Sequence, residues 1–359
     1  MMGSPGAAVG LRVVVAGVGR FGALHVRVWR ELGADVVGLC DVDEQRLADV
    51  AAGCGGTAVS ADLATLLARV EPDVVVVASD EATHAALTVT ALEAGCHVFV
   101  EKPLAMSGAE AWRVAAAAAA AGREVVAGHI SRFAAPYVRM QQTLRGGGIG
   151  RLCALRLRRD FSRQWFLSFG DRVHPVWESC IHDIDLAVSF AGRPVRRVSA
   201  VAAQVAEGEA PSVVSALLEF RGGVIATVES AWLVPDSAPQ TLAGALALDG
   251  SIVAEAEVLG TDGILRQRLV ADNLVEWTSS GTVVPDLSLW PEEDGTVGGA
   301  LRQEVAYAID VFLGRRPADR VPLEEACWGV EAAEAVIASL AAGAPVEVPD
   351  RGPGSERQR

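Results

Sequence analysis

The segment HPVWESCIHDID, residues 174–185, contains the residue types that general acid–base chemistry requires. Pro175 is typical of the first turn of a helix, and four-residue spacing on a helix places Glu178 and His182 on the same face. An imidazole titrates near neutral pH and a nearby carboxylate raises its pKa, so the pair is a candidate acid and base. The same pair also occurs on solvated helix faces, and the segment alone leaves both interpretations open.

A glycine-rich turn near the start of the chain has the spacing of a dinucleotide-binding loop. In VVVAGVGRFGALH, three glycines follow an apolar strand and open a helix, where they allow a tight turn and a close backbone approach to a pyrophosphate. Asp41 ends the next strand, where a carboxylate accepts hydrogen bonds from an adenosine ribose and repels a 2′-phosphate. We therefore predict NAD rather than NADP or a ligand-free turn, with contacts from Gly17, Val18, Gly19, Arg20, Phe21, Gly22 and Asp41.

The elements around these residues predict two domains. Between residues 11 and 128, short β-branched runs alternate with helical segments, which indicates a doubly wound parallel sheet. Beyond residue 128 the pattern predicts helices over 134–144, 175–191, 298–314 and 323–342, and strands joined by hairpin turns at RGG and at Asp249-Gly250. The fold class is therefore α/β: a Rossmann domain at 1–128, an α+β domain with a large, mainly antiparallel open sheet at 129–345, and a tail at 346–359. The last helix is a candidate to pack back on the first domain.

The composition describes a globular protein that binds a small molecule. Of 359 residues, 51% are hydrophobic and 21% are charged, which is sufficient for a buried core. A formal net charge of −14 opposes binding to nucleic acid or to an anionic membrane. The six cysteines form no CxxC pair, the apolar runs are too short to span a bilayer, and the first residues lack an export-signal pattern. We expect a cytoplasmic protein with reduced cysteines and no nucleic-acid or membrane partner.

A Lys-Pro turn lies at the carboxyl edge of the predicted parallel sheet, where such folds bind ligands, because the strand HVFV ends in EKPLA. The motifs GVGRFGALH, VASDEATH, ALEAGCHVFVEKPLA, GHISRF and ESCIHDID occur in this order. Together with the closing VEAAEAVIASLAAGAPVEV, they make the chain resemble the Gfo/Idh/MocA oxidoreductases, which include glucose-fructose oxidoreductase and inositol dehydrogenase. The resemblance covers most of the chain and is more specific for the family than for a substrate.

The resemblance implies roles for particular residues. Lys102 matches a lysine beside the nicotinamide and the reacting hydroxyl, and His182 matches the general acid/base of the family. Ser79 and His84 fall where the family has a small residue and a histidine near the cofactor, and Glu101 is expected to contact the cofactor with them.

Three positions depart from the family's pattern. Asp80 stands where a proline is usual, which leaves the loop shape open, and Ser131 replaces a commoner asparagine. Inositol dehydrogenases place an aspartate four residues before the catalytic histidine, whereas this chain has Glu178, whose extra methylene predicts a different substrate outline. Four residues are candidates for substrate contact, although the two tryptophans could equally line the core: Arg132, Trp165, Trp177 and Asp185.

The predicted function is that of an NAD-dependent dehydrogenase acting on a secondary hydroxyl of a sugar, aminosugar or cyclitol, in either direction. His182 would remove the hydroxyl proton, with Glu178 beside it, while Lys102 stabilises the developing alkoxide. An acidic chain with Glu178 in the pocket suits a cationic aminosugar, as in aminoglycoside pathways. The alternative is a non-catalytic, NAD(P)-binding, sugar-sensing regulator of the same fold, which would not need both Lys102 and His182.

Two further expectations concern metals and assembly. His174, Glu178 and His182 have the spacing of a ligand set, but Pro175 places His174 before the helix and a lysine close to the pair opposes a cation, so we expect no metal. The resemblance also implies a homodimer or homotetramer formed through the open face of the antiparallel sheet.

Overall fold

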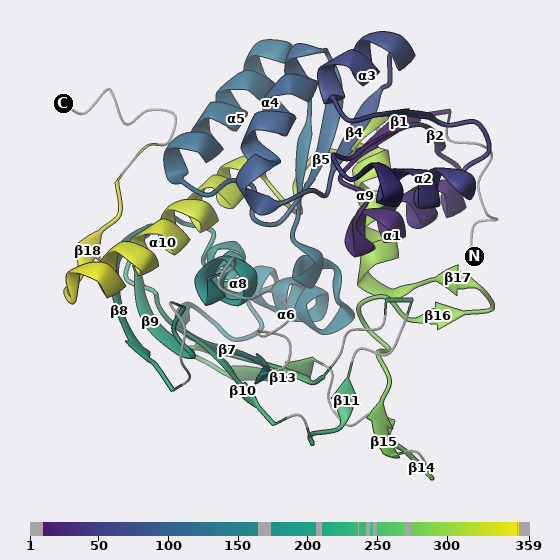
Figure 1. Cartoon of the computed structure of the whole chain (residues 1–359). Coiled ribbons are helices and arrows are strands. Elements are labelled where there is room, and N and C mark those ends of the chain that lie inside the picture. Colours follow the sequence, from purple (N-terminus) through teal and green to yellow (C-terminus); the bar gives the residue numbers. More distant parts are fainter. Residues whose placement is uncertain are drawn as a thin grey trace. The chain divides into compact units, whose positions relative to one another are not determined.

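The computed structural model describes residues 10–163, 174–205, 210–235, 237–241, 245–246, 250–269, 274–279, 281–349 and 351. The chain divides into two compact units (Figure 1). The first contains the residues up to Gly128 together with Glu293–Val297 and Leu301–Leu323, and the second contains His129–Glu292, Gly298–Ala300 and the residues from Glu324 onward. The first break therefore follows residue 128, whereas residues 301–323, which the predicted second domain included, belong to the first unit.

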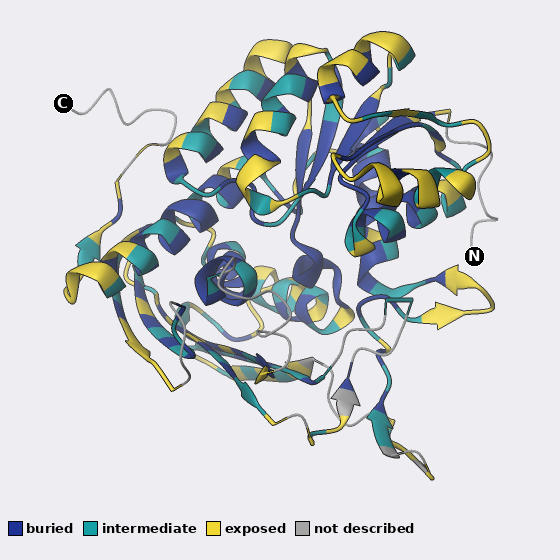
Figure 2. Ribbon diagram, viewed as in Figure 1, coloured by how far each residue is buried: buried dark blue, intermediate teal, exposed yellow. Residues whose placement is uncertain are grey.

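The first unit contains a six-stranded parallel sheet in the order β3-β2-β1-β4-β5-β6. This is the strand order of dinucleotide-binding Rossmann folds, in which ligands bind at the carboxyl edge where the order reverses, between β1 and β4. Apart from the exposed Arg12 at the start of β1, the central strands β1 and β4 are apolar on both faces and buried (Figure 2). The bounds are β1 (Arg12–Ala16), β2 (Asp35–Cys40), β3 (Ala58–Ser60), β4 (Val74–Val77), β5 (His97–Glu101) and β6 (Val125–Gly128).

Helices cover both faces of this sheet. Three of them begin at a side chain that accepts a hydrogen bond from the backbone N–H three residues later, namely Asp43, Asp62 and Ser107. The alanine run forms a helix, as predicted, and ends at Gly122 with a positive φ of 61°. The bounds are α1 (Arg20–Glu31), α2 (Glu44–Ala52), α3 (Leu63–Val70), η1 (Glu81–Thr83), α4 (His84–Glu93) and α5 (Gly108–Ala121).

A seven-stranded mixed sheet forms the second unit, in the order β13-β12-β7-β10-β9-β8-β18. All neighbouring pairs described are antiparallel except β10 and β7, which run parallel. The hairpin predicted at RGG joins β9 to β10. The bounds are β7 (Leu152–Ser162), β8 (Val195–Ala203), β9 (Val213–Phe220), β10 (Ile225–Val234), β12 (Ile252–Gly260), β13 (Ile264–Leu269) and β18 (Val346–Glu347).

One face of this sheet is covered and the other is open. Along β7, Leu155, Leu157 and Phe161 are buried while Arg156 and Arg158 between them are exposed. The helices α6 (Ala135–Arg145), α8 (Ile181–Ala191) and α10 (Leu323–Ala342) lie on the covered side (Figure 1). The turn η2 (Ile130–Phe133) and the π-helical turn η4 (Val176–Cys180), which leads directly into α8, complete this layer.

The remaining elements are short strands and one long helix. The strands β11 (Gln240–Thr241), β15 (Gly281–Val284) and β14 (Glu276–Thr278) form a small sheet, and β16 (Glu292–Glu293) pairs with β17 (Thr296–Val297). The helix α9 (Gly299–Phe312) follows, and within the first unit its Phe312 ring stacks on Trp29 of α1 with centroids 6.4 Å apart.

One prediction of detail differs from the structure and another is not tested by it. The turn predicted at Asp249-Gly250 lies partly outside the described residues and stays a prediction, while β12 forms a hairpin with β13 through residues 261–263. Part of the predicted tail is ordered, because Val346 and Glu347 pair with β8 and the Val348 N–H donates to the Arg196 carbonyl at 2.8 Å. Val348 is also buried, which fixes this end of the chain against the sheet.

Among the described residues, no helix combines the length and the apolar character needed to cross a bilayer.

Candidate functional site

The glycine loop between β1 and α1 leaves space for a ligand where the sequence predicts one. Gly17 has a φ of +87°, and a Cβ there would lie 2.5 Å from the backbone of Ala78, while a Cβ on Gly22 would overlap the Gly17 carbonyl. A Cβ on Gly19 would meet nothing within 4 Å. Gly17 and Gly22 are thus required by the fold itself, whereas the space over Gly19 fits a pyrophosphate at the start of α1.

Asp41 lies at the end of β2 and faces the same loop. Its Oδ2 accepts a hydrogen bond from the Val18 N–H at 2.8 Å, and its Oδ1 accepts one from the Asp43 N–H at 2.9 Å. These two bonds fix the carboxylate, and each oxygen keeps a second lone pair for a ribose hydroxyl. Val18 is buried, while Arg20 and Phe21 are exposed and half-buried, respectively, at the first turn of α1.

The Lys-Pro turn follows β5 and is fixed on its N-terminal side by Glu101. Glu101 Oε1 lies 2.8 Å from Nε2 of the buried His25 on α1, and Glu101 Oε2 accepts a hydrogen bond from the Lys102 N–H at 3.2 Å. The Lys102-Pro103 bond is cis. Glu101 therefore acts on the backbone of Lys102 through its side chain.

His84 lies on the other side of this turn. It is buried, with Nδ1 2.7 Å from the Pro103 carbonyl oxygen and Nε2 3.2 Å from the Ser79 carbonyl oxygen. Asp80, at the unusual position, accepts a hydrogen bond from the Ala82 N–H and so begins the turn η1. His84 thus connects the loop after β4 to the Lys-Pro turn, and its predicted contact with the cofactor stays a prediction.

Glu178 and His182 stand out by exposure in the second unit. Between Pro175 and Val188 these two side chains are the partly exposed ones, and every other residue of that stretch is buried. His174, just before the helix, is also half-buried, and its Nδ1 accepts a hydrogen bond from the Val176 N–H at 3.2 Å. The spacing by fours therefore places Glu178 and His182 on one accessible face, as the sequence predicts.

The helical segment that carries this pair begins with a π-helical turn, η4, a rare element that often occurs at functional sites. Its side chains are anchored to the sheet beneath. Ser179 accepts a hydrogen bond from Trp232 Nε1 on β10 at 2.7 Å, and both residues are buried.

Two buried ion pairs anchor the segment just after His182. Arg159 on β7 donates two hydrogen bonds to Asp183, at 3.0 and 3.2 Å, and Arg132 on η2 donates two to Asp185, at 2.7 and 2.8 Å. Burial disfavours the charged guanidinium of Arg132, but the carboxylates of Asp185 and Glu325 outweigh that effect and raise its pKa. Both arginines therefore stay cationic inside the fold.

The predicted substrate residues behave differently from Glu178 and His182. Arg132 and Asp185 are buried and bonded to each other, and Trp177 is buried, so their contact with a substrate stays a prediction. Trp165 lies outside the described residues. Ser131 is buried, and its hydroxyl accepts a hydrogen bond from Arg159 Nη2 at 3.3 Å. The serine at this position, where the family commonly has an asparagine, therefore contacts the ion pair of Arg159 and Asp183.

Sequence reasoning missed Arg159 and Asp183, although one signal was available. In LCALRLRRDF the alternation puts Leu155, Leu157 and Phe161 on the covered face, and Arg159 has the same parity. A charged residue at an apolar position of a strand requires a buried partner.

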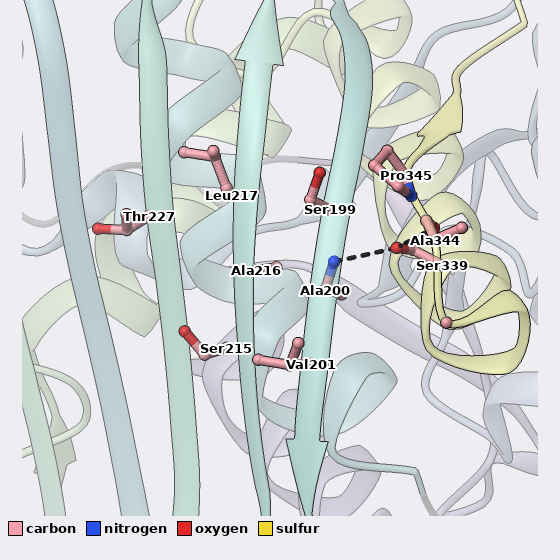
Figure 3. Close-up of a pocket in the computed structure, with 11 residues that line it drawn as sticks. Ser199, Ala200, Val201, Ser215, Ala216, Leu217, Thr227, Ser339, Ala344 and Pro345 are labelled. Atoms are coloured by element: carbon pink, nitrogen blue, oxygen red, sulfur yellow. Dashed lines mark hydrogen bonds between the residues drawn. The ribbon is translucent and has the colours of Figure 1, made fainter.

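A groove on the open face of the second sheet contains none of the predicted site residues. Figure 3 shows it between β8, β9 and β10 and the end of α10, with a volume of about 310 Å³. Ser199, Val201, Ser215 and Leu217 line it, and Ser339 accepts a hydrogen bond from the Ala200 N–H at 3.0 Å. Because α8 covers the opposite face, the groove is separate from Glu178 and His182.

Comparison with known proteins agrees with this geometry. The family described as oxidoreductase family, NAD-binding Rossmann fold, matches residues 11–129, and the GFO/IDH/MocA C-terminal domain matches residues 137–266. Inositol 2-dehydrogenase 1 of Saccharopolyspora erythraea is 36% identical over 193 residues, which is 53% of this chain and 57% of that protein. D-apiose dehydrogenase of Paraburkholderia graminis is 29% identical over 289 residues, 76% of this chain and 72% of that protein.

A solved structure extends the likeness over the whole fold. GenD2 from gentamicin A biosynthesis, in complex with NAD, superposes with a TM-score of 0.81 at 24% identity and covers 98% of this chain and 100% of that one. The two family matches together span well over half of the chain and include the glycine loop, the Lys-Pro turn and the helix of His182. The chain belongs to the GFO/IDH/MocA oxidoreductase family, and its first unit is an NAD-binding Rossmann domain.

Proposed function

We propose that the chain is an NAD-dependent dehydrogenase that oxidises, or reversibly forms, a secondary hydroxyl of a sugar, aminosugar or cyclitol. Because the chain spans 57% of the length of the inositol 2-dehydrogenase that it matches, this activity is inferred from the site rather than transferred from that relative. The observation that carries the proposal is the exposure of Glu178 and His182 on an otherwise buried segment. A buried helix gains no stability by presenting two ionisable groups, so their accessibility points to a ligand.

The first unit would hold NAD through residues that the fold already positions. The backbone around Gly19 offers the start of α1 to the pyrophosphate, and Asp41 offers its free lone pairs to the adenosine ribose. NAD supplies the hydride acceptor when it is bound.

His182 would take the proton from the hydroxyl as that hydroxyl is oxidised, and return it in the reverse direction. A neutral imidazole suits this task near neutral pH, and Glu178, one turn away, can orient the ring or bind a second hydroxyl. Lys102 would stabilise the developing alkoxide with its ammonium group. The turn that carries Lys102 is fixed by Glu101 and His84 in the first unit, which supports a defined position for its side chain.

The substrate class within this proposal is a cationic aminosugar of the kind found in aminoglycosides. The support is the additional reach of the Glu178 carboxylate and the net charge of −14, both of which favour a cation over a neutral ring.

The alternative is an NAD(P)-binding, sugar-sensing regulator without catalysis. Turnover separates the two functions. A panel of sugars, inositols and aminoglycosides with NAD⁺, followed by the absorbance of NADH, should identify a substrate, and His182→Ala should reduce kcat by about a hundredfold or more with NAD binding unchanged. Ligand binding with no turnover by the unmodified chain would support the regulator instead, whereas full turnover by His182→Ala would remove His182 from the role of acid and base.

We also propose that two copies associate through the open face of the second sheet. Val201, Leu217 and Ile225 are exposed on this face, on three adjacent strands. Neighbouring β12 and β13 instead carry paired charges, with Arg266 bonded to Glu257 and Arg268 to Glu255. A sedimentation experiment on the unmodified chain and on Leu217→Lys tests this: the variant should shift to the monomer, and an unchanged molecular mass would exclude this face.

A further inference from the structure

Two buried arginines hold the helix turn that follows His182. Arg159 contacts the residue directly after His182, and Arg132 contacts the residue three positions after it, each through two hydrogen bonds to one carboxylate. Such two-point contacts between a planar guanidinium and a carboxylate restrict both partners in distance and in orientation. The remaining side of the segment is fixed by the bond between Ser179 and Trp232. The helix turn of His182 is therefore attached to η2, β7 and β10 at once.

Both ion pairs are buried, and their contribution to stability alone does not explain this placement. The side chains of Arg159, Asp183, Arg132 and Asp185 are each at most 5% exposed. Buried ion pairs are weak contributors to stability, since desolvation offsets much of their attraction, and apolar residues of similar volume often serve as well. Two such pairs within three residues of a proposed base indicate a role in placing that base.

We infer that Arg159 and Arg132 are positioning residues that hold His182 for proton transfer and balance the carboxylates flanking it. The inference rests on the proposed function, because it assigns these arginines to the site of His182. Without Arg159, the buried carboxylate of Asp183, the residue next to His182 in the sequence, would have no counter-charge from this arginine. With the pair intact, the charge of Asp183 is balanced by that of Arg159.

Other ionisable groups lie in the elements packed around α8. Glu178 lies on η4, and Glu325 on α10 receives a hydrogen bond from Arg132 at 2.5 Å. His129 before η2 lies 3.4 Å from Asp185, and Tyr137 on α6 is buried near Arg159 and Asp183, where burial raises its pKa. All of these stay unchanged in the variants below, so a difference between variants reports on the two ion pairs.

Two substitutions separate position from charge. Arg159→Lys keeps the positive charge and loses the two-point contact, so we expect kcat to fall about tenfold or more while the pH profile and the KM for NAD stay unchanged. Asp183→Asn keeps the shape and leaves the buried Arg159 guanidinium without its carboxylate partner on the residue next to His182, and a guanidinium does not lose its proton. We therefore expect the acid limb of the kcat profile, and the imidazole titration of His182 followed by NMR, to move to lower pH.

Arg156→Met is the matched control, because Arg156 lies on the same strand as Arg159 but on the open face, paired with Glu257. It should leave kcat, the pH profile and the NMR titration unchanged. Wild-type kcat in Arg159→Lys, or an unmoved His182 titration in folded Asp183→Asn, would overturn the inference. If the proposed function fails instead, so that His182→Ala is fully active, the NMR titration still shows whether Asp183 and Arg159 control the proton of His182.

Discussion

His25 Nε2 lies 2.8 Å from Glu101 Oε1, and this contact joins the first helix of the chain to the strand end that carries Lys102, 76 residues away. His25 is fully buried and its ring packs against Phe21 and Phe99, with centroids 5.7 and 5.0 Å away. The other oxygen of Glu101 accepts the hydrogen bond of the Lys102 N–H. His25 therefore holds one oxygen of Glu101, and the other oxygen of Glu101 holds the backbone of Lys102.

Replacing His25 by Leu should leave Glu101 without this partner. We expect the free energy of unfolding to fall by about 1–3 kcal/mol, the usual cost of an unsatisfied buried polar group. Chemical denaturation measures it, and Arg113→Ala, which removes only an exposed pair with Glu110, is the control and should change stability by about 0.5 kcal/mol or less. A loss no larger than that of the control would show that the contact is unimportant.

Replacing two glycines of the same loop by alanine should affect different properties, stability in one case and NAD binding in the other. Gly22→Ala places a Cβ against the Gly17 carbonyl, so we expect a loss of stability of about 2 kcal/mol or more. Gly19→Ala places a Cβ in open space, so thermal unfolding should be unchanged while the Kd for NAD rises about tenfold or more. Calorimetry gives both quantities. NAD binding of normal affinity by Gly19→Ala would remove the pyrophosphate from this position.

Glu178→Gln tests the substrate class. The amide keeps the shape of the side chain and loses its charge, so kcat/KM for an amine-bearing sugar should fall about tenfold or more, and much less for the matching sugar that carries a hydroxyl instead. Steady-state kinetics on the matched pair of substrates provides the measurement. Equal losses on both would exclude recognition of an amine by Glu178.

His174 should make stability depend on pH in mildly acidic solution. Burial lowers the pKa of His174, so the unfolded chain binds its proton more readily than the folded one. The contribution to stability is complete above the unfolded pKa of about 6.5 and is lost as the pH falls through the lower, folded pKa. Protonation also removes the acceptor that Nδ1 offers to the Val176 N–H.

His174→Asn should abolish that part of the pH dependence, because an amide oxygen can accept the same bond and does not titrate. His174→Ala should instead lower stability at every pH, because the Val176 N–H loses its hydrogen-bond acceptor. Urea unfolding between pH 5 and 8 separates the two variants, and an identical slope in His174→Asn and the unmodified chain would assign the dependence to other groups.

Local patterns in the sequence were sufficient to predict much of this molecule. The glycine loop, the strand ending at Asp41 and the hairpin at RGG depend on neighbouring residues and on period, and each forms as expected. The common face of Glu178 and His182 follows from their spacing in the same way.

The features that could not be predicted depend on contacts between distant residues. Nothing near Arg132 in the sequence indicates that it will bond to Asp185, 53 residues later. Placement of residues 301–323 in the first unit and of Val346 beside β8 likewise depends on which surfaces are left uncovered once the sheets have formed. Propensity carries no such information.

The π-helical turn at Val176–Cys180 holds one more residue than an α-helical turn would need. Deleting Ser179 or Cys180 would let the segment run as an uninterrupted α-helix and would shorten the separation of Glu178 and His182 from four residues to three. The carboxylate would then approach the imidazole from a different direction although neither residue had been substituted. In this stretch the number of residues matters as much as their identity.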